Sequence, residues 1–347
     1  MALGDLDLVY CTACGLVFNR AFRADLVPYG PGYENDQTAS PSFSRHVDDR
    51  VRAIVEDGVR HREIIEIGCG NGNFLRRLCR TSGSRGLGLD PAARAAHFPD
   101  GGGVRLEAHP FMEPALERPA DVVVVRHVIE HVDDPVGFLR RIRTVLRPSS
   151  HALLYLETPA LEWILESSAS WDLCYEHASY FSERALRNTL LLAGFAVLRV
   201  ERVFGAQYFW LSAAPSPERR DPEPAIGDEL ERLEAFVARQ ALDLRQWTER
   251  IQALAARGPV AVWGAGAKGA TFLHLADPDA SRVAFVIDIH PQKQGRYLAA
   301  TGHPVVSPES VSLRGLANVI LLNPNYRDEV ERRLAELGLP ARLHVAE

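Results

Sequence analysis

Short runs of β-branched residues alternate with amphipathic segments through the first two thirds of the chain. The runs predict strands at EIIEIG (63–68), RGLGLD (85–90), ADVVVVR (120–126), HALLYLE (151–157) and FAVLRVERV (195–203). Between them, apolar residues at helical spacing predict helices at about 44–59, and at 73–81, 134–147 and 182–194. Ser182 is the expected N-cap of the last helix. Strands and helices that alternate in this way favour a doubly wound, Rossmann-like α/β domain with a parallel sheet.

The alternation stops at APSPERRDPEP (214–224), a proline-rich charged stretch that we interpret as an interdomain linker. A helix is predicted over residues 226–257, and a second strand–helix alternation begins at Gly258. The apolar stripe of that helix comprises Leu230, Leu233, Phe236 and Val237. Four parts are therefore expected: an irregular segment with a CxxC pair and a tyrosine-rich loop (1–43), a first α/β domain (44–215), a linker with its helix (216–257), and a smaller Rossmann-like domain (258–347).

The bulk composition is that of an ordinary globular protein, with 46% hydrophobic and 24% charged residues. A net charge of −6 argues against nucleic acid as the main partner, because phosphate backbones require a basic face. No apolar run approaches a membrane span, and the start MALGDLDLVYC does not have the pattern of a signal peptide. Five scattered cysteines do not suggest a disulfide framework. We expect a cytoplasmic protein, monomeric or homodimeric, that acts on a small molecule and has no membrane partner.

The first predicted strand runs directly into a glycine-rich turn, IIEIGCGNGNF (64–74). Gly68, Gly70 and Gly72 allow a sharp turn and a close approach to a ligand, and the following helix start offers free N–H groups. The next strand ends in Asp90, near the offset of roughly 20 residues at which an acid binds ribose hydroxyls. Glu66 stands where a nicotinamide-dinucleotide fingerprint usually has an apolar residue. A Rossmann dehydrogenase is the alternative to the interpretation that follows.

The E-x-G-x-G-x-G loop, the acid that ends the second strand and the segment RHVIEHVDDP (126–135) together resemble the class I S-adenosylmethionine-dependent methyltransferases. The resemblance covers residues 64–148. It implies S-adenosylmethionine as the cofactor, with Asp90 on the ribose hydroxyls, Pro91 and Phe111 near the adenine, and Arg126 and His127 near the sulfonium. The implied donor-binding residues are Glu66, Gly68, Gly70, Gly72, Asp90, Pro91, Phe111, Arg126 and His127.

The stretch WDLCYEHASYFS (171–182) is unusually rich in polar and aromatic residues. It follows the strand HALLYLE, and the carboxyl ends of strands are where a doubly wound sheet binds its ligands. A methyl acceptor loses a proton as it attacks, and a histidine backed by a carboxylate accepts such a proton. Glu176 and His177 are therefore candidates for the base and its orienting group. The alternative is that Glu176 caps a helix and His177 is a structural histidine.

The N-terminal CxxCG, the tyrosine-bearing loop, the Y-E-H segment and the C-terminal GAGAKGATFL and DIHPQKQGRYLAATGHPVVSPE resemble the sugar C-methyltransferases of deoxysugar pathways. That resemblance spans nearly the whole chain. It implies natural-product, including antibiotic, biosynthesis, and a nucleotide-linked 4-keto sugar that is deprotonated at C3 so that the enolate attacks the methyl group. The implied catalytic residues are Tyr175, Glu176, His177 and His127. The implied substrate-binding residues are Tyr29, Tyr33, Gln37, Tyr180, Gln207 and Lys268.

Two features depart from the sugar C-methyltransferase pattern. Those relatives usually carry two CxxC pairs that hold a zinc ion, whereas this chain has only Cys11 and Cys14, with His46 as the nearest histidine. Because a structural zinc requires four ligands, we expect no zinc site, or at most a partial one. In addition, RHVIEHVDDP is typical of methyltransferases at large. Methylation of oxygen or nitrogen on another natural-product intermediate is therefore an alternative, as is a methyltransferase-like binding subunit without activity.

A second glycine-rich turn, VAVWGAGAKGATFL (260–273), follows a predicted strand in the C-terminal domain, and Asp288 ends the next strand. Alone, this pattern suggests a second nucleotide site and an oxidoreductase or epimerase that uses a nicotinamide cofactor. Lys268 is placed to meet a phosphate at the helix start, and Lys293 and Arg296 to face a diphosphate. The alternative is that the turn is a relic of the fold with a solvated lysine.

Overall fold

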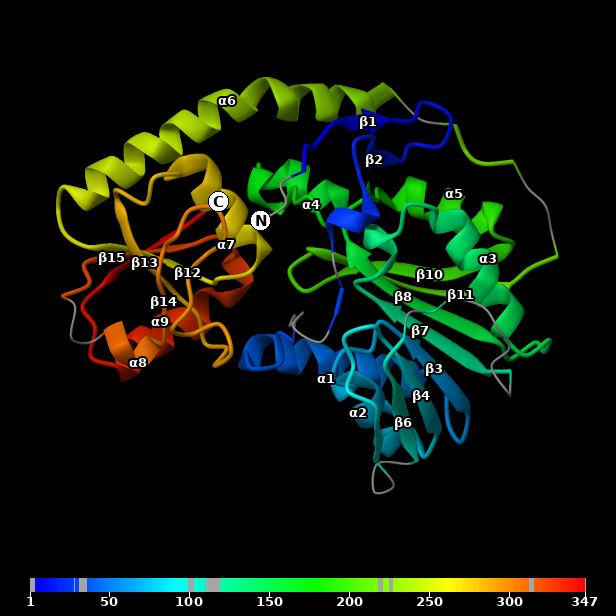
Figure 1. Cartoon of the computed structure of the whole chain (residues 1–347). Helices are drawn as coiled ribbons and strands as arrows, with labels where there is room; N and C mark the ends of the chain where they lie inside the picture. The colour runs from blue at the N-terminus through cyan, green and yellow to red at the C-terminus, as the bar shows by residue number, and fades with distance from the viewer. Residues whose placement is uncertain are drawn as a thin grey trace.

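Two α/β domains are joined by one long helix (Figure 1). The computed structural model describes residues 4–27, 29–30, 36–98, 103–109, 111, 119–217, 221–224, 227–311 and 315–346. In Figure 1 the first domain lies to the right and the C-terminal domain to the left, with helix α6 (Gly227–Ala255) running above both. The two-domain α/β architecture predicted from the sequence is confirmed.

The first domain is built on an eight-stranded sheet in the order β10-β11-β8-β7-β3-β4-β6-β5. Its strands are β3 (Glu63–Ile67), β4 (Arg85–Leu89), β5 (Ala96–Phe98), β6 (Val104–Glu107), β7 (Val122–Arg126), β8 (Leu153–Pro159), β10 (Phe195–Val203) and β11 (Tyr208–Pro215). The five central strands from β8 to β6 pair in parallel. The sheet is not parallel throughout, because β11 pairs antiparallel with both β8 and β10, and β5 pairs antiparallel with β6.

Helices cover both faces of this sheet because alternate residues of its central strands point to opposite sides. Ile64, Val122 and Val124 pack in one core with helices α1 (Pro41–Glu56) and α2 (Asn73–Ser82). Ile65 and Val123 pack in another core with helices α3 (Pro135–Val145) and α5 (Glu183–Leu192). The predicted doubly wound arrangement follows from these two cores.

The ends of these helices obey simple capping chemistry. The side chain of Ser182 accepts a hydrogen bond from the Ala185 N–H, so the predicted N-cap of α5 is confirmed. Ser40 caps α1 in the same way, and Asp134 caps α3. Proline stands in the first turn of both α1 and α3, where its missing N–H costs nothing.

The N-terminal segment forms a small sheet with the segment that contains Glu176 and His177. Strand β1 (Leu8–Tyr10) pairs with β2 (Val17–Asn19), and β2 pairs antiparallel with β9 (Ser179–Tyr180). The CxxC turn connects β1 to β2. This pairing ties residues 8–19 to the candidate acid–base segment, a contact that periodicity alone did not predict.

The C-terminal domain is a five-stranded parallel sheet in the order β14-β13-β12-β15-β16. Its strands are β12 (Val260–Trp263), β13 (Val283–Ile287), β14 (Val305–Val306), β15 (Asn318–Leu321) and β16 (Arg342–Val345). Its helices are α7 (Ala267–Ala276), α8 (Pro308–Val311) and α9 (Arg327–Glu336). A short 3₁₀ turn, η5 (Pro324–Tyr326), precedes α9.

The first domain also has short elements outside its sheet. They are helix α4 (Leu161–Glu166) and the 3₁₀ turns η1 (Ala24–Leu26), η3 (Ile129–His131) and η4 (Ser170–Asp172).

Helix α6 buries less of its predicted apolar stripe than the sequence suggested. Phe236 is buried and Leu233 is partly buried in the shared core, but Leu230 and Val237 are exposed, the latter to 68%. Aromatic packing holds the helix to both domains, because Trp247 of α6 makes edge-to-face contacts with Trp171 and Phe272.

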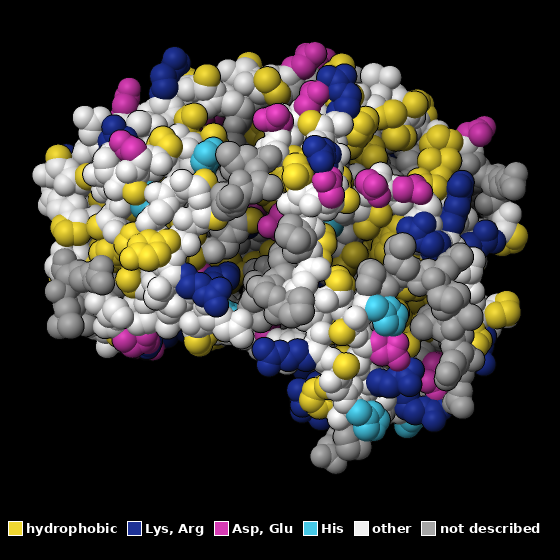
Figure 2. Space-filling model, in the orientation of Figure 1, with side chains coloured by type: hydrophobic (Ala, Val, Ile, Leu, Met, Phe, Trp, Pro, Cys, Tyr) yellow, Lys and Arg dark blue, Asp and Glu magenta, His cyan; other side chains and the backbone are white. Residues whose placement is uncertain are grey.

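The surface has no single sign of charge on the face drawn in Figure 2, where Lys and Arg side chains lie among Asp and Glu. Among the helices of the described residues, none combines the length and apolarity needed to cross a membrane. The expectations about localisation, oligomeric state and nucleic acid stay predictions.

A buried amide cluster joins the two domains. Gln207, which directly precedes β11, is buried, and its Oε1 accepts hydrogen bonds from Asn323 Nδ2 at 2.9 Å and Asn325 Nδ2 at 3.2 Å. Asn325 also donates to the Phe204 carbonyl at 2.8 Å. The cluster fixes the loop before η5 against the hairpin β10–β11.

Gln207→Leu should destabilise the protein by about 1–3 kcal/mol, because the buried Asn323 amide loses its acceptor. Chemical denaturation followed by tryptophan fluorescence measures this change. The control is Gln252→Leu on the exposed side of α6, which should stay within about 0.5 kcal/mol of wild type. Equal stability of the two variants would show that the amide cluster does not hold the domains together.

Candidate active site

The site lies where the strand order of the first sheet reverses. Strand β3 lies between β4 and β7. After β3 the chain forms β4 on one side of it, and later it crosses over to form β7 on the other side. In open α/β sheets, ligands bind outside the carboxyl ends of the strands at such a point. The glycine loop follows β3, Asp90 follows β4, and His127 follows β7. The fold therefore brings the three predicted donor-site segments to one edge.

The glycine loop adopts a conformation that other residues avoid. Gly68, Gly70 and Gly72 have φ of +74°, +52° and +76°. A Cβ at Gly68 would collide with the Val128 side chain, whereas a Cβ at Gly70 would meet open space. Gly72 is the N-cap of α2 and has no side chain to cap it, and the first N–H of that helix, that of Asn73, donates to Asn71 Oδ1 at 3.1 Å. These features fit a cofactor that lies directly on the backbone.

Asp90 stabilises the same loop. Its Oδ2 accepts the Gly70 N–H at 2.9 Å, and its Oδ1 accepts the Ala92 N–H at 2.7 Å. Each carboxylate oxygen has a second lone pair, so the side chain retains acceptors for ribose hydroxyls. Pro91 is half-buried in the turn that follows, and Phe111 packs edge-to-face on Phe138 with ring centroids 6.1 Å apart.

Glu66 lies in β3, just before the glycine loop, and is 2% exposed. Burial raises the pKa of its carboxyl to about 8, although the positive charge of Arg126 acts to lower it. Its Oε2 has no hydrogen-bond partner among the described residues. A protonated Glu66 is a hydrogen-bond donor as well as an acceptor, which suits a polar ligand group above it.

Glu157, near the carboxyl end of β8, binds the polar side chains on the β8 side of this edge. It is completely buried, and it accepts hydrogen bonds from Arg126 Nε at 2.6 Å and from His46 Nε2. Burial alone would raise the pKa of Glu157, but the charge of Arg126 and the bond to His46 lower it well below its usual range. Arg126 is thus held by Glu157, with its guanidinium 4.4 Å from the Phe74 ring centroid. Sequence reasoning missed both this carboxylate and the role of His46.

His127 lies between two buried carboxylates. Its Nδ1 is 3.7 Å from Glu130 Oε1 and its Nε2 is 3.8 Å from Glu157 Oε2. Its backbone has φ of +53°, a conformation uncommon outside glycine that is often found at functional sites. The ring also makes an edge-to-face contact with Tyr208 at 4.7 Å. This placement agrees with a position beside the donor pocket.

The Y-E-H segment comes to the same edge from a distant part of the sequence. The Glu176 carbonyl accepts a hydrogen bond from His131 Nδ1 at 2.8 Å, and the His177 ring packs edge-to-face on His131 at 4.9 Å. Tyr175 faces another way, because its hydroxyl accepts the Arg23 N–H at 3.0 Å and donates to the Ala21 carbonyl at 3.3 Å. In this structure Tyr175 anchors the N-terminal segment.

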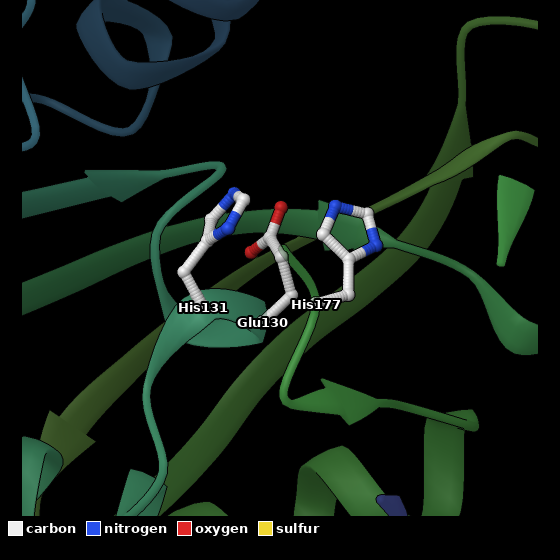
Figure 3. Close-up of side chains that lie close together, drawn as sticks. All are labelled: Glu130, His131 and His177. Carbon is white, nitrogen blue, oxygen red and sulfur yellow. The ribbon is translucent and has the colours of Figure 1, made fainter. Parts of the chain in front are cut away.

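Glu130 lies between the rings of His131 and His177 (Figure 3). Burial raises the pKa of Glu130, but His127, His131 and His177 together lower it to about 2, so the carboxylate is ionised. Burial, with a smaller effect of His131, lowers the pKa of His177 to about 3, so its ring is neutral. Sequence reasoning did not select Glu130, although the acid lies directly before His131 in RHVIEHVDDP.

The predicted substrate-binding residues are dispersed. Tyr29 reaches the site, since its hydroxyl lies 2.9 Å from His131 Nδ1. Tyr180 is buried and donates to the Cys174 carbonyl at 2.9 Å. Gln37 accepts a hydrogen bond from Tyr326 at 3.1 Å. Tyr33 lies outside the described residues.

Gln207 and Lys268 contact the other domain instead of an open pocket. Gln207 belongs to the interdomain amide cluster described above. Lys268, at the start of α7, forms an ion pair with Asp172 of η4, and its Nζ lies 5.3 Å from the Trp163 ring centroid. Asp288 accepts the Ala265 N–H at 2.7 Å, just as Asp90 accepts that of Gly70. The second glycine loop thus shares this hydrogen bond with the first, but only Gly264 in it has a positive φ, whereas Gly266 has φ of −87°.

Cys11 and Cys14 are free thiols in the turn between β1 and β2. Within the described residues, neither belongs to a group of three side chains with metal-ligating atoms close together. His46, the other zinc candidate, is bonded to Glu157. The expectation of no zinc at the CxxC turn stays a prediction.

Comparison with known proteins agrees with this geometry. Residues 42–200 match the family described as a methyltransferase domain, and residues 220–339 match that described as a C-methyltransferase C-terminal domain. Over 96% of the chain the sequence is 27% identical to the C-methyltransferase NovU of Streptomyces niveus, of which it covers 84%. A shorter match, 30% identical, covers 42% of this chain and 47% of the tRNA U34 carboxymethyltransferase of Saccharophagus degradans.

Among solved structures, the 1,6-didemethyltoxoflavin-N1-methyltransferase of Burkholderia thailandensis shares 19% identity over 52% of this chain and 80% of that chain, with a TM-score of 0.40. A similarity of that size carries no argument about function. The two family matches and the relative that spans both domains do bear on function, and they agree with the glycine loop described above. The chain is an S-adenosylmethionine-dependent methyltransferase, and its residues 220–339 match a C-methyltransferase C-terminal domain.

Proposed function

We propose that the enzyme methylates a carbon atom of a nucleotide-linked keto sugar in a natural-product pathway, such as that of an antibiotic containing a deoxysugar. The match of residues 220–339 to a C-methyltransferase C-terminal domain supports a carbon acceptor. The similarity to NovU along 96% of the chain supports it further, because it includes the N-terminal segment and both domains.

The donor sits on the glycine loop, with Asp90 toward its ribose hydroxyls. S-adenosylmethionine supplies an electrophilic methyl group there, and S-adenosylhomocysteine is released after transfer. Asp90 binds the Gly70 N–H of the loop, and Glu66, just before the loop, is buried. His127 lies at the end of β7, between the donor loop and the Y-E-H segment.

A carbon next to a ketone becomes a nucleophile only when it loses a proton. The observation that carries this proposal is the contact between His177 and His131, at 4.9 Å, at the carboxyl end of β7. The neutral imidazole of His177 takes the proton from carbon, the resulting enolate forms the new carbon–carbon bond, and the bond from sulfur to the methyl group breaks. The ionised Glu130 stabilises the imidazolium that forms.

The position of His177 is set by the rest of the chain. Strand β9, two residues later, pairs with β2, and the Glu176 carbonyl is held by His131. Tyr29 lies above the same histidine and covers the site from the N-terminal segment. A base held in this way can contribute roughly 10²–10⁴-fold to the rate.

Asp90→Ala should weaken S-adenosylmethionine binding by about 1–3 kcal/mol, because the ribose hydroxyls lose a charged acceptor and the Gly70 N–H loses its partner. Isothermal titration calorimetry measures the change, and Asp90→Asn should be milder because it keeps one acceptor oxygen. The control is Asp228→Ala, an exposed acid on α6. Wild-type affinity in a folded Asp90→Ala protein would remove Asp90 from the donor site.

His177→Ala should lower turnover by 10²-fold or more, within the range for a positioned base, while S-adenosylmethionine affinity stays near wild type. Glu176→Gln should be milder than His177→Ala, because it keeps the backbone carbonyl that binds His131. The control is His274→Ala on the exposed face of α7. The assay uses a nucleotide-linked 4-keto sugar, and NMR locates the new methyl group.

Two results would contradict the proposal. If His177→Ala retains full turnover and only its melting temperature falls, the segment is structural. If NMR places the methyl group on oxygen or nitrogen, the enzyme is not a C-methylating one. Either result leaves the donor site as described.

A further inference from the structure

Glu130, His131 and His177 bring three metal-ligating groups together at the edge of the sheet. One donor atom from each side chain lies within 4.8 Å of the others. Figure 3 shows the carboxylate between the two imidazoles, with Glu130 and His131 on the turn after β7 and His177 on the segment before β9. The two parts of this cluster are 46 residues apart in sequence, so it exists only in the folded chain.

The carboxylate presents one oxygen to this cluster. Glu130 is 2% exposed, and its Oε2 accepts the Thr158 hydroxyl at 3.0 Å. Its Oε1 is buried and makes no hydrogen bond with any described residue, and His127 Nδ1 lies 3.7 Å away, beyond hydrogen-bond distance. A buried carboxylate oxygen without a hydrogen bond is costly, and a cation bound to it removes this cost.

The two histidines also have nitrogen lone pairs to offer. The Glu176 carbonyl can only accept a hydrogen bond, so the proton of His131 is on Nδ1 and the lone pair on Nε2. Metal-bound histidines usually have this outer contact, a ring N–H donated to a carbonyl or carboxylate. In His177, Nδ1 is buried without a hydrogen-bond partner in the described part of the chain.

We propose that Glu130, His131 and His177 bind one divalent first-row transition-metal ion. Two imidazoles and one carboxylate favour zinc, cobalt, nickel or iron over magnesium and calcium, which prefer oxygen ligands. Three protein ligands leave a position for water or for an oxygen of the acceptor, as in catalytic zinc sites. The Thr158 hydroxyl and the Glu176 carbonyl are the outer contacts that orient the ligands.

Metal binding would compete with proton transfer, a consequence that rests on the proposed function. A metal ion on His177 occupies the lone pair that the base requires, so the metal-loaded enzyme should not turn over. Metal binding itself does not depend on the acceptor or on the role of His177. The two proposals therefore fail separately.

The test is a titration of cobalt(II) alone into protein freed of metal by a chelator, with visible absorption as the readout. Wild type should take up one cobalt per chain, and zinc should displace it. Glu130→Gln and His131→Gln keep the shape of the site but each removes a metal ligand. Loss of an outer contact weakens metal binding roughly 10–100-fold, and each of these variants should weaken cobalt binding by more than that. Thr158→Val, which removes only an outer contact, should weaken it by about 10–100-fold.

The control is the double variant Cys11→Ser with Cys14→Ser, since the CxxC turn is the other candidate for soft metals. It should bind cobalt like wild type. Near-ultraviolet circular dichroism checks that each variant is folded. Failure of folded wild type to bind cobalt overturns the proposal. Uptake that survives Glu130→Gln and His131→Gln but is lost in the cysteine variant also overturns it.

Discussion

The Glu157 carboxylate is fully buried at the end of β8, and the architecture of the active-site edge depends on its neutralisation. A charge in the protein interior is tolerated only when it is paired and hydrogen-bonded. Arg126 from the end of β7 and His46 from α1 supply that pairing, and the backbone N–H of His127 binds the Glu157 carbonyl. The carboxylate of Glu157 thus links β8 to the end of β7 and to α1, while its backbone carbonyl binds the N–H of His127.

A second buried carboxylate, Glu130, organises the acceptor side. Its charge is stabilised by three histidines, one of which, His177, is delivered by the segment before β9. That segment keeps its place because β9 pairs with β2 and because Tyr175 binds the backbone of the N-terminal segment. The N-terminal segment therefore supports the candidate acid–base group.

The C-terminal domain is coupled to the same edge by polar contacts. The pair Lys268–Asp172 joins α7 to η4, just before the Y-E-H segment, and Gln207 joins the β10–β11 hairpin to the loop before α9. Edge-to-face packing of Trp171 on Phe272 and Trp247 fills the space between. A movement of the C-terminal domain would consequently shift the segment that carries His177.

The sequence by itself determined the local features: the strand–helix alternation, the glycine loop with Asp90, and the cap at Ser182. Each is readable because it depends on neighbours within a few residues, through side-chain periodicity, the absence of a Cβ, or a single hydrogen bond. The antiparallel place of β11 and the pairing of β2 with β9 needed the tertiary structure, because they join segments far apart in the chain. The same holds for the active-site carboxylates. Glu130 and Glu157 look like ordinary acids in the sequence, and only burial, with the histidines and Arg126 that folding brings to them, decides their charge and their role.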